Sequence, residues 1–66
     1  MYYVIKWRGS SAQQGERMID ALSLSEAVTF LDEAIREKGG ASLWQDGREI
    51  MHGHIVGTRA VITWRD

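Results

Sequence analysis

Apolar and polar residues alternate at the start of the chain, and this alternation predicts a β-strand over residues 2–8. The segment is rich in aromatic and β-branched side chains, which favour strands. Because successive side chains of a strand point to opposite faces, the segment has two different faces. One face carries Tyr3, Ile5 and Trp7, and the other carries Tyr2, Val4, Lys6 and Arg8.

A loop and a second strand are predicted next. Residues 9–15 are small and polar with a glycine at each end, which is typical of a loop. Residues 16–22 predict a strand at the edge of the sheet, in which Met18 and Ile19 compete for the inward-facing position. Neighbouring strands joined by a short loop usually pair, so we expect these two strands to form a hairpin.

The best-defined element is a helix predicted over residues 24–38. Ser23 and Glu26 have the spacing of a capping box, in which the serine hydroxyl accepts a hydrogen bond from the backbone amide of Glu26. Lys38 followed by two glycines is typical of a helix end, since lysine complements the helix dipole and glycine turns left-handed easily. Apolar residues at helical spacing form one stripe. The stripe consists of Leu24, Ala27, Val28, Leu31, Ala34 and Ile35.

A β-hairpin is predicted after the helix. Residues 41–45 and 48–52 flank Asp46-Gly47, a sequence that favours a two-residue hairpin turn. Gly53 and Gly57 then indicate a bulge or a second turn between them.

The last strand is predicted over residues 58–65, where alternation resumes. The elements therefore follow the order β-β-α-β-β-β, and a chain of 66 residues has room for one domain. The fold class predicted for residues 1–66 is α+β, with a single helix packed on an antiparallel sheet of four to five strands.

The bulk composition narrows the classes of partner and location. Eight basic residues stand against nine acidic ones, a net charge of −1, whereas strong nucleic-acid binders usually carry a positive excess. The chain has no cysteine, which excludes disulfides and thiolate metal sites and favours a cytoplasmic location. The N-terminus lacks the pattern of a signal peptide, and no apolar stretch is long enough to span a bilayer.

The chain begins with Met1, and we expect it to be a complete small gene product. Chains of this size are common among accessory and inhibitory proteins of phages and mobile elements. We therefore expect this functional class, on an association with size and without support from particular residues.

Catalytic and metal-binding patterns are weak in this sequence. His52 and His54 would point the same way on a strand and could supply two ligands of a metal site, but no third or fourth ligand has a fitting spacing. No serine lies in a nucleophile elbow, and no glycine-rich segment has the pattern of a phosphate loop. We expect neither an enzyme nor a bound cofactor or metal.

Protein binding is the function that the sequence favours, and six residues are the candidates for the contact. An antiparallel sheet with one helix leaves an open face and two edges that can recruit a partner, and exposed tryptophans are frequent binding hot spots. The candidate residues are Tyr2, Lys6, Arg8, Trp44, Arg59 and Arg65.

Nucleic-acid binding is the alternative, because an open sheet face with aromatic and basic side chains is used by several proteins that bind single strands. If the first and last strands were neighbours, Lys6, Arg8, Arg59 and Arg65 would lie together on a basic face, with the acidic residues on the helix behind it. A homodimer formed through a sheet edge is a further expectation.

Overall fold

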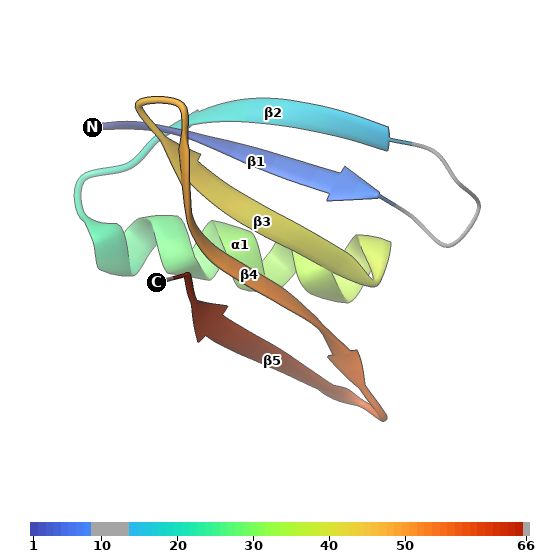
Figure 1. Cartoon of the computed structure of the whole chain (residues 1–66). Coiled ribbons are helices and arrows are strands. Elements are labelled where there is room, and N and C mark those ends of the chain that lie inside the picture. The colour runs from blue at the N-terminus through green and yellow to red at the C-terminus, as the bar shows by residue number, and fades with distance from the viewer. Residues whose placement is uncertain (9–13, 66) are drawn as a thin grey trace.

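Residues 1–8 and 14–65 are described by a computed structural model, in which one helix packs on one face of an antiparallel sheet (Figure 1). The strands are β1 (Tyr2–Arg8), β2 (Gln14–Asp20), β3 (Gly40–Gln45), β4 (Arg48–Val56) and β5 (Arg59–Trp64), and the helix is α1 (Leu24–Lys38). The sheet has five strands in the order β2-β1-β3-β4-β5. The predicted α+β fold and its element order are confirmed.

Helix α1 has the bounds that the sequence predicts, and both of its ends are capped. The Ser23 hydroxyl accepts a hydrogen bond of 3.2 Å from the backbone amide of Glu26. At the other end Gly39 has a φ of 93°, in the left-handed region, and its amide donates to the carbonyl of Ile35 at 2.7 Å. The Cβ-free residue at this position lets the chain turn back into β3 without strain.

The core lies between α1 and the sheet. The helix packs mainly on β3 and also contacts β1, β4 and β5. Leu31 and Ile35 are fully buried, whereas Leu24 and Val28 at the edges of the apolar stripe are only partly buried. The buried core residues are Tyr3, Ile5, Ile19, Ala21, Ala27, Leu31, Ile35, Ala41, Leu43 and Met51.

Strand β2 begins and ends two residues earlier than the sequence predicts, because its register with β1 fixes both ends. Gln14 pairs with Arg8, and Asp20 pairs with Tyr2. Gln14 and Gly15 therefore belong to the strand. The other residues of the predicted loop, 9–13, lie outside the described residues.

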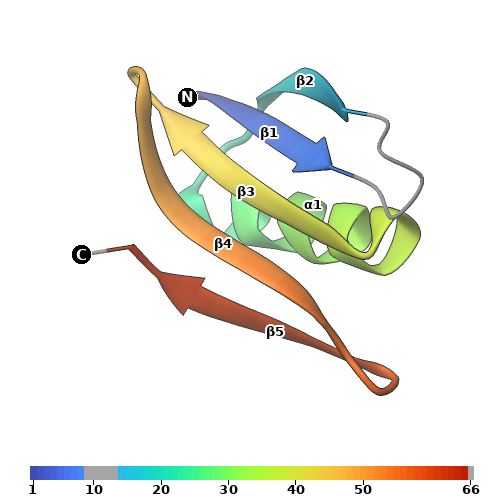
Figure 2. The same ribbon diagram turned by 45° about the vertical axis from the view of Figure 1, so that its right-hand side comes forward.

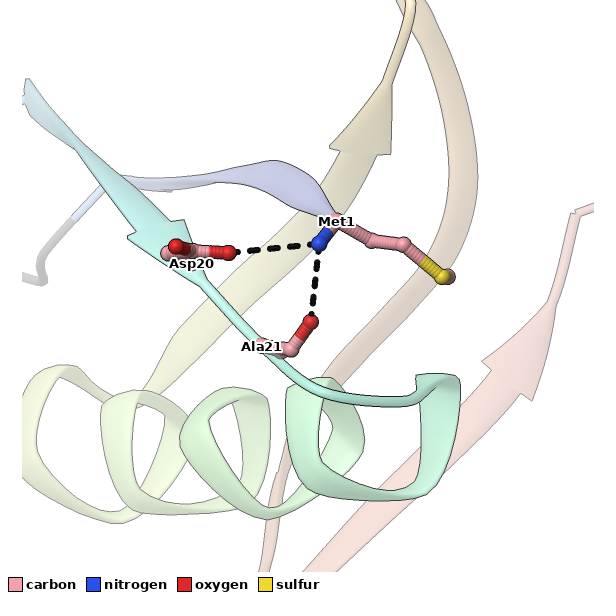
Figure 3. Close-up of polar contacts among 3 residues, drawn as sticks. All are labelled: Met1, Asp20 and Ala21. Atoms are coloured by element: carbon pink, nitrogen blue, oxygen red, sulfur yellow. Dashed lines mark hydrogen bonds and ion pairs between the residues drawn. The ribbon is translucent and has the colours of Figure 1, made fainter.

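The inward position of β2 is taken by Ile19, which is buried, and Met18 points to the opposite face. Met1 holds the end of this hairpin, since its ammonium group contacts the Asp20 carboxylate at 3.2 Å and the Ala21 carbonyl at 3.1 Å (Figure 3).

The expectation of a bulge or a second turn between Gly53 and Gly57 is wrong, since β4 continues through Gly53 to Val56 and the turn comes only at Gly57. A Cβ on Gly53 would collide with the Ile35 side chain and would lie 2.6 Å from the Val61 carbonyl oxygen. Glycine is therefore required here by the close approach of the helix to the sheet. The bulge lies earlier in β4, where Leu43 pairs with Met51 but Trp44 pairs with Glu49.

Both hairpins of the C-terminal half close with two-residue turns. Asp46 and Gly47 have φ values of 53° and 77°, the positive values of a type I′ turn, and the predicted two-residue turn between Gln45 and Arg48 is confirmed. Gly57 has a φ of 66° and begins the turn between β4 and β5. The sheet is strongly twisted, with β2 and β5 at its two edges (Figure 2).

Candidate functional site

The face of the sheet opposite α1 is the candidate functional surface. In residues 1–8 and 14–65, no helix or second sheet lies on this face, as the two views of the ribbon show (Figures 1 and 2). Alternation along each strand and the strand register decide which side chains lie on it. We call it the open face.

Four apolar side chains meet at one end of the open face. Val4 of β1 pairs with Met18 of β2 on one side and with Trp44 of β3 on the other, and Tyr2 lies two residues before Val4. Tyr2 and Met18 are 67% and 68% exposed. These four residues line a hollow of about 250 Å³ together with Lys6, Glu16 and the Asp46-Gly47 turn. We call Tyr2, Val4, Met18 and Trp44 the open-face patch.

Trp44 is held in a defined orientation by two polar neighbours. Its indole Nε1 donates a hydrogen bond of 2.8 Å to the Ser42 hydroxyl, and the Lys6 ammonium lies 4.0 Å from the centroid of its ring. A cation at this distance from an aromatic face is attracted by the ring quadrupole. The indole is therefore a half-buried, ordered element of the surface.

Three of the predicted partner-binding residues, Tyr2, Lys6 and Trp44, are thus brought together. Val4 and Met18 belong to the same surface but are not among the six contact residues that the sequence predicts. The signal for Met18 was present, because Ile19 on the inward face forces its neighbour outward. Which strands flank β1 is set by the sheet order, which the sequence pattern does not contain.

The predicted basic cluster is not formed, because β1 and β5 are not neighbours. Two strands, β3 and β4, separate them, which corresponds to a distance of about 14 Å at normal strand spacing. Arg8 and Arg59 therefore lie on the same face but in different parts of it.

The other two basic candidates lie beside acidic residues. Arg65 forms an ion pair of 3.3 Å with Glu49, and Lys6 pairs with Glu16 across β1 and β2. The open face thus carries charges of both signs, and the expected separation into a basic sheet and an acidic helix is only partial.

The two histidines lie on the open face of β4. His52 pairs with Ser42 and with Thr63, and His54 pairs with Gly40 and with Val61. None of these neighbours is a metal ligand of the imidazole or carboxylate type. Over the described ranges, no three His, Asp or Glu side chains are placed to hold a metal ion.

The three tryptophans differ in exposure. Trp7 and Trp44 are half-buried, but Trp64 is 59% exposed on the helix side of β5, opposite Met51. Trp7 lies across Gly15 of β2, where a Cβ would come within 2.5 Å of the indole ring.

In the part of the chain that the structure describes, no helix has the length and apolar character needed to cross a bilayer.

Comparison of the chain with models of protein families, with curated proteins and with solved structures finds no match.

Proposed function

We propose that this chain is a small, non-enzymatic, cytoplasmic protein-binding module whose open-face patch occupies a surface of a larger protein. The observation that carries the proposal is the exposure of Tyr2 and Met18 next to the ordered ring of Trp44. Exposed apolar side chains that are contiguous and rimmed by polar groups mark interaction sites on soluble proteins.

The composition of the open-face patch favours a protein as its partner. Tyrosine, tryptophan and methionine are enriched at protein interfaces, and the polar residues around the patch, Lys6, Glu16 and Asp46, would form the rim. Because the rim carries both signs of charge, it can select a partner by complementarity without attracting every anion. A role as an accessory or inhibitory protein of a phage or mobile element is part of the proposal and rests on the association with small chains alone.

The test measures the amount of a protein partner that the purified chain captures. It compares this amount with that captured by variants in which single exposed residues are changed. We expect Met18→Glu to reduce the amount of captured partner by at least about tenfold, since an unpaired charge would be buried within the open-face patch. The matched control is Leu22→Glu, because Leu22 is 89% exposed but lies in the connection between β2 and α1. Both variants should melt within a few degrees of the wild type. Equal loss for both variants, or for neither, would contradict the proposal.

Nucleic-acid binding through the same face is the other outcome of this test. It predicts capture that nuclease treatment abolishes and affinity for single-stranded DNA that falls steeply with salt. In that case Arg8→Glu combined with Arg59→Glu should remove binding, whereas a protein partner held by the open-face patch should tolerate the double substitution.

A further inference from the structure

Strand β5 is an edge strand, and the direction of its backbone groups can be derived from one bond. The amide of Arg65 donates to the carbonyl of Ile50 in β4 at 3.0 Å. In an antiparallel ladder every second residue bonds to the same neighbour, so Arg59, Val61 and Thr63 also face β4. The amides and carbonyls of Ala60, Ile62 and Trp64 then point away from the sheet, and their side chains lie on the helix side.

Only the first residue of this edge strand, Arg59, carries one of the features that usually prevent a strand from pairing further. Natural edges carry charges, proline or a bulge, and the opposite edge strand β2 contains Glu16, Arg17 and Asp20. Residues 60–64 of β5 contain no charge, no proline and no glycine, and four of the five are β-branched or aromatic. The β4–β5 pairing runs without a register shift from the turn to Trp64.

We propose that two copies of this chain associate through β5, antiparallel and in the register that places Ile62 opposite Ile62 of the second copy. Only registers that pair outward-facing residues with each other can form the hydrogen bonds. In this register the backbone groups of Ala60 in one copy bond to those of Trp64 in the other, and those of Ile62 bond to those of the second Ile62. The pair of Ala60 and Trp64 occurs twice. The ladder would contain about six hydrogen bonds, and the two sheets would become continuous.

Side-chain size is what makes this register self-complementary. Trp64 is 59% exposed, and in this register it lies opposite Ala60 of the second copy, whose small side chain leaves room for the indole. The same contact occurs twice, since a two-fold axis relates the copies. On the open face Val61 lies opposite Thr63, and Arg59 lies opposite Arg65, whose charge is offset by Glu49 at 3.3 Å.

The association leaves the open-face patch accessible. The two-fold axis runs perpendicular to the sheet, so both helices lie on one side and both open faces on the other. The patch is on β1, β2 and β3, at the far end of each sheet from β5. Failure of this inference is therefore separate from failure of the proposed function.

The first test is the mass of the chain in solution as a function of concentration. Sedimentation from about 1 µM to about 1 mM should show a shift from the 7.5 kDa chain to twice that mass. Trp64→Lys should raise the dissociation constant by at least about tenfold. Leu22→Lys is the matched control, because Leu22 is an exposed apolar residue in the connection between β2 and α1, away from β5, and the substitution should not change the constant. A monomer over the whole range would overturn the proposal.

The second test determines the register by disulfide formation. The chain has no native cysteine, so only the introduced cysteines can react. Val61 and Thr63 are opposite each other in a non-hydrogen-bonded pair, with Cα atoms about 4.5 Å apart, within the range of a disulfide. A mixture of Val61→Cys and Thr63→Cys chains should form the mixed disulfide much faster than either chain alone. Equal rates for the three samples would overturn the register even if a dimer forms.

Discussion

Gly53 shows how one missing side chain sets the distance between the helix and the sheet. Ile35, which is fully buried, occupies the space that a Cβ on Gly53 would need. The carbonyl oxygen of Val61, in the neighbouring strand β5, would lie 2.6 Å from the same Cβ. Because one of these obstacles is a backbone atom, a larger residue at this position cannot be accommodated by a change of rotamer.

We expect Gly53→Ala to lower the free energy of unfolding by about 1–3 kcal/mol, the usual cost of overpacking a core. Gly40→Ala is the matched control. The nearest atoms to a Cβ there are the Gly53 carbonyl oxygen at 3.5 Å and the His54 Cβ at 3.9 Å, which are ordinary contacts. Urea denaturation of both variants measures the difference, and equal stability of the two would show that the helix can move off the sheet at no cost.

Single residues were predictable where their own pattern decides their position. Alternation alone placed Tyr3 and Ile5 in the core. Gly53 was misassigned, because glycine is common in turns, and the need for it comes from a helix side chain eighteen positions earlier. That requirement exists only after the elements have packed.

Among the elements, α1 has the clearest local definition. Its start is fixed by the bond from the Glu26 amide to the Ser23 hydroxyl, and its end by the left-handed Gly39. These signals lie within a few residues of each other in the sequence, which is why the bounds of the helix were predicted correctly. The Asp46-Gly47 turn is local in the same sense.

Ser23→Ala should lower the free energy of unfolding by about 1 kcal/mol, because the Glu26 amide loses its acceptor at the helix start. Ser25→Ala is a suitable control, since Ser25 is an exposed serine one position inside the helix and caps no amide. Thermal and urea unfolding would measure both. A loss from Ser25→Ala as large as that from Ser23→Ala would mean that the hydroxyl at the N-cap has no special role.

Strand β2 illustrates the limit of local signals. Its residues Gln14 and Gly15 have the composition of a loop, yet they are in the strand because β1 extends to Arg8 and offers them partners. Gly15 also makes room for Trp7. A pairing partner therefore decided these bounds, and no propensity of the segment itself could have done so.

At the scale of the molecule, the sequence predicted the number and kind of elements but not the order of the strands. The strand order decides which residues meet at the candidate site. The open-face patch exists because β1 lies between β2 and β3, and the basic cluster does not exist because β3 and β4 separate β1 from β5. Both outcomes depend on pairings between distant segments, and an alternating pattern is compatible with several such orders.

The placement of β1 between β2 and β3 also bears on the order in which the strands pair during folding. Strands β3, β4 and β5 are joined by two-residue turns, so they can pair at little entropic cost. The pairing of Ile5 with Leu43 requires closing a loop that contains β2 and the whole of α1, which costs more conformational entropy. We therefore expect β3, β4 and β5 to form the folding nucleus, and β1 to pair with β3 only after this nucleus has formed.

This order of events can be tested with two conservative substitutions, Ile5→Val in β1 and Ile62→Val in β5. Each should lower the free energy of unfolding by about 0.5–1.5 kcal/mol. In stopped-flow experiments Ile5→Val should mainly accelerate unfolding, and Ile62→Val should mainly slow refolding. The reverse result would mean that the hairpin of β1 and β2 docks first, and that the long loop closes before the C-terminal strands are in place.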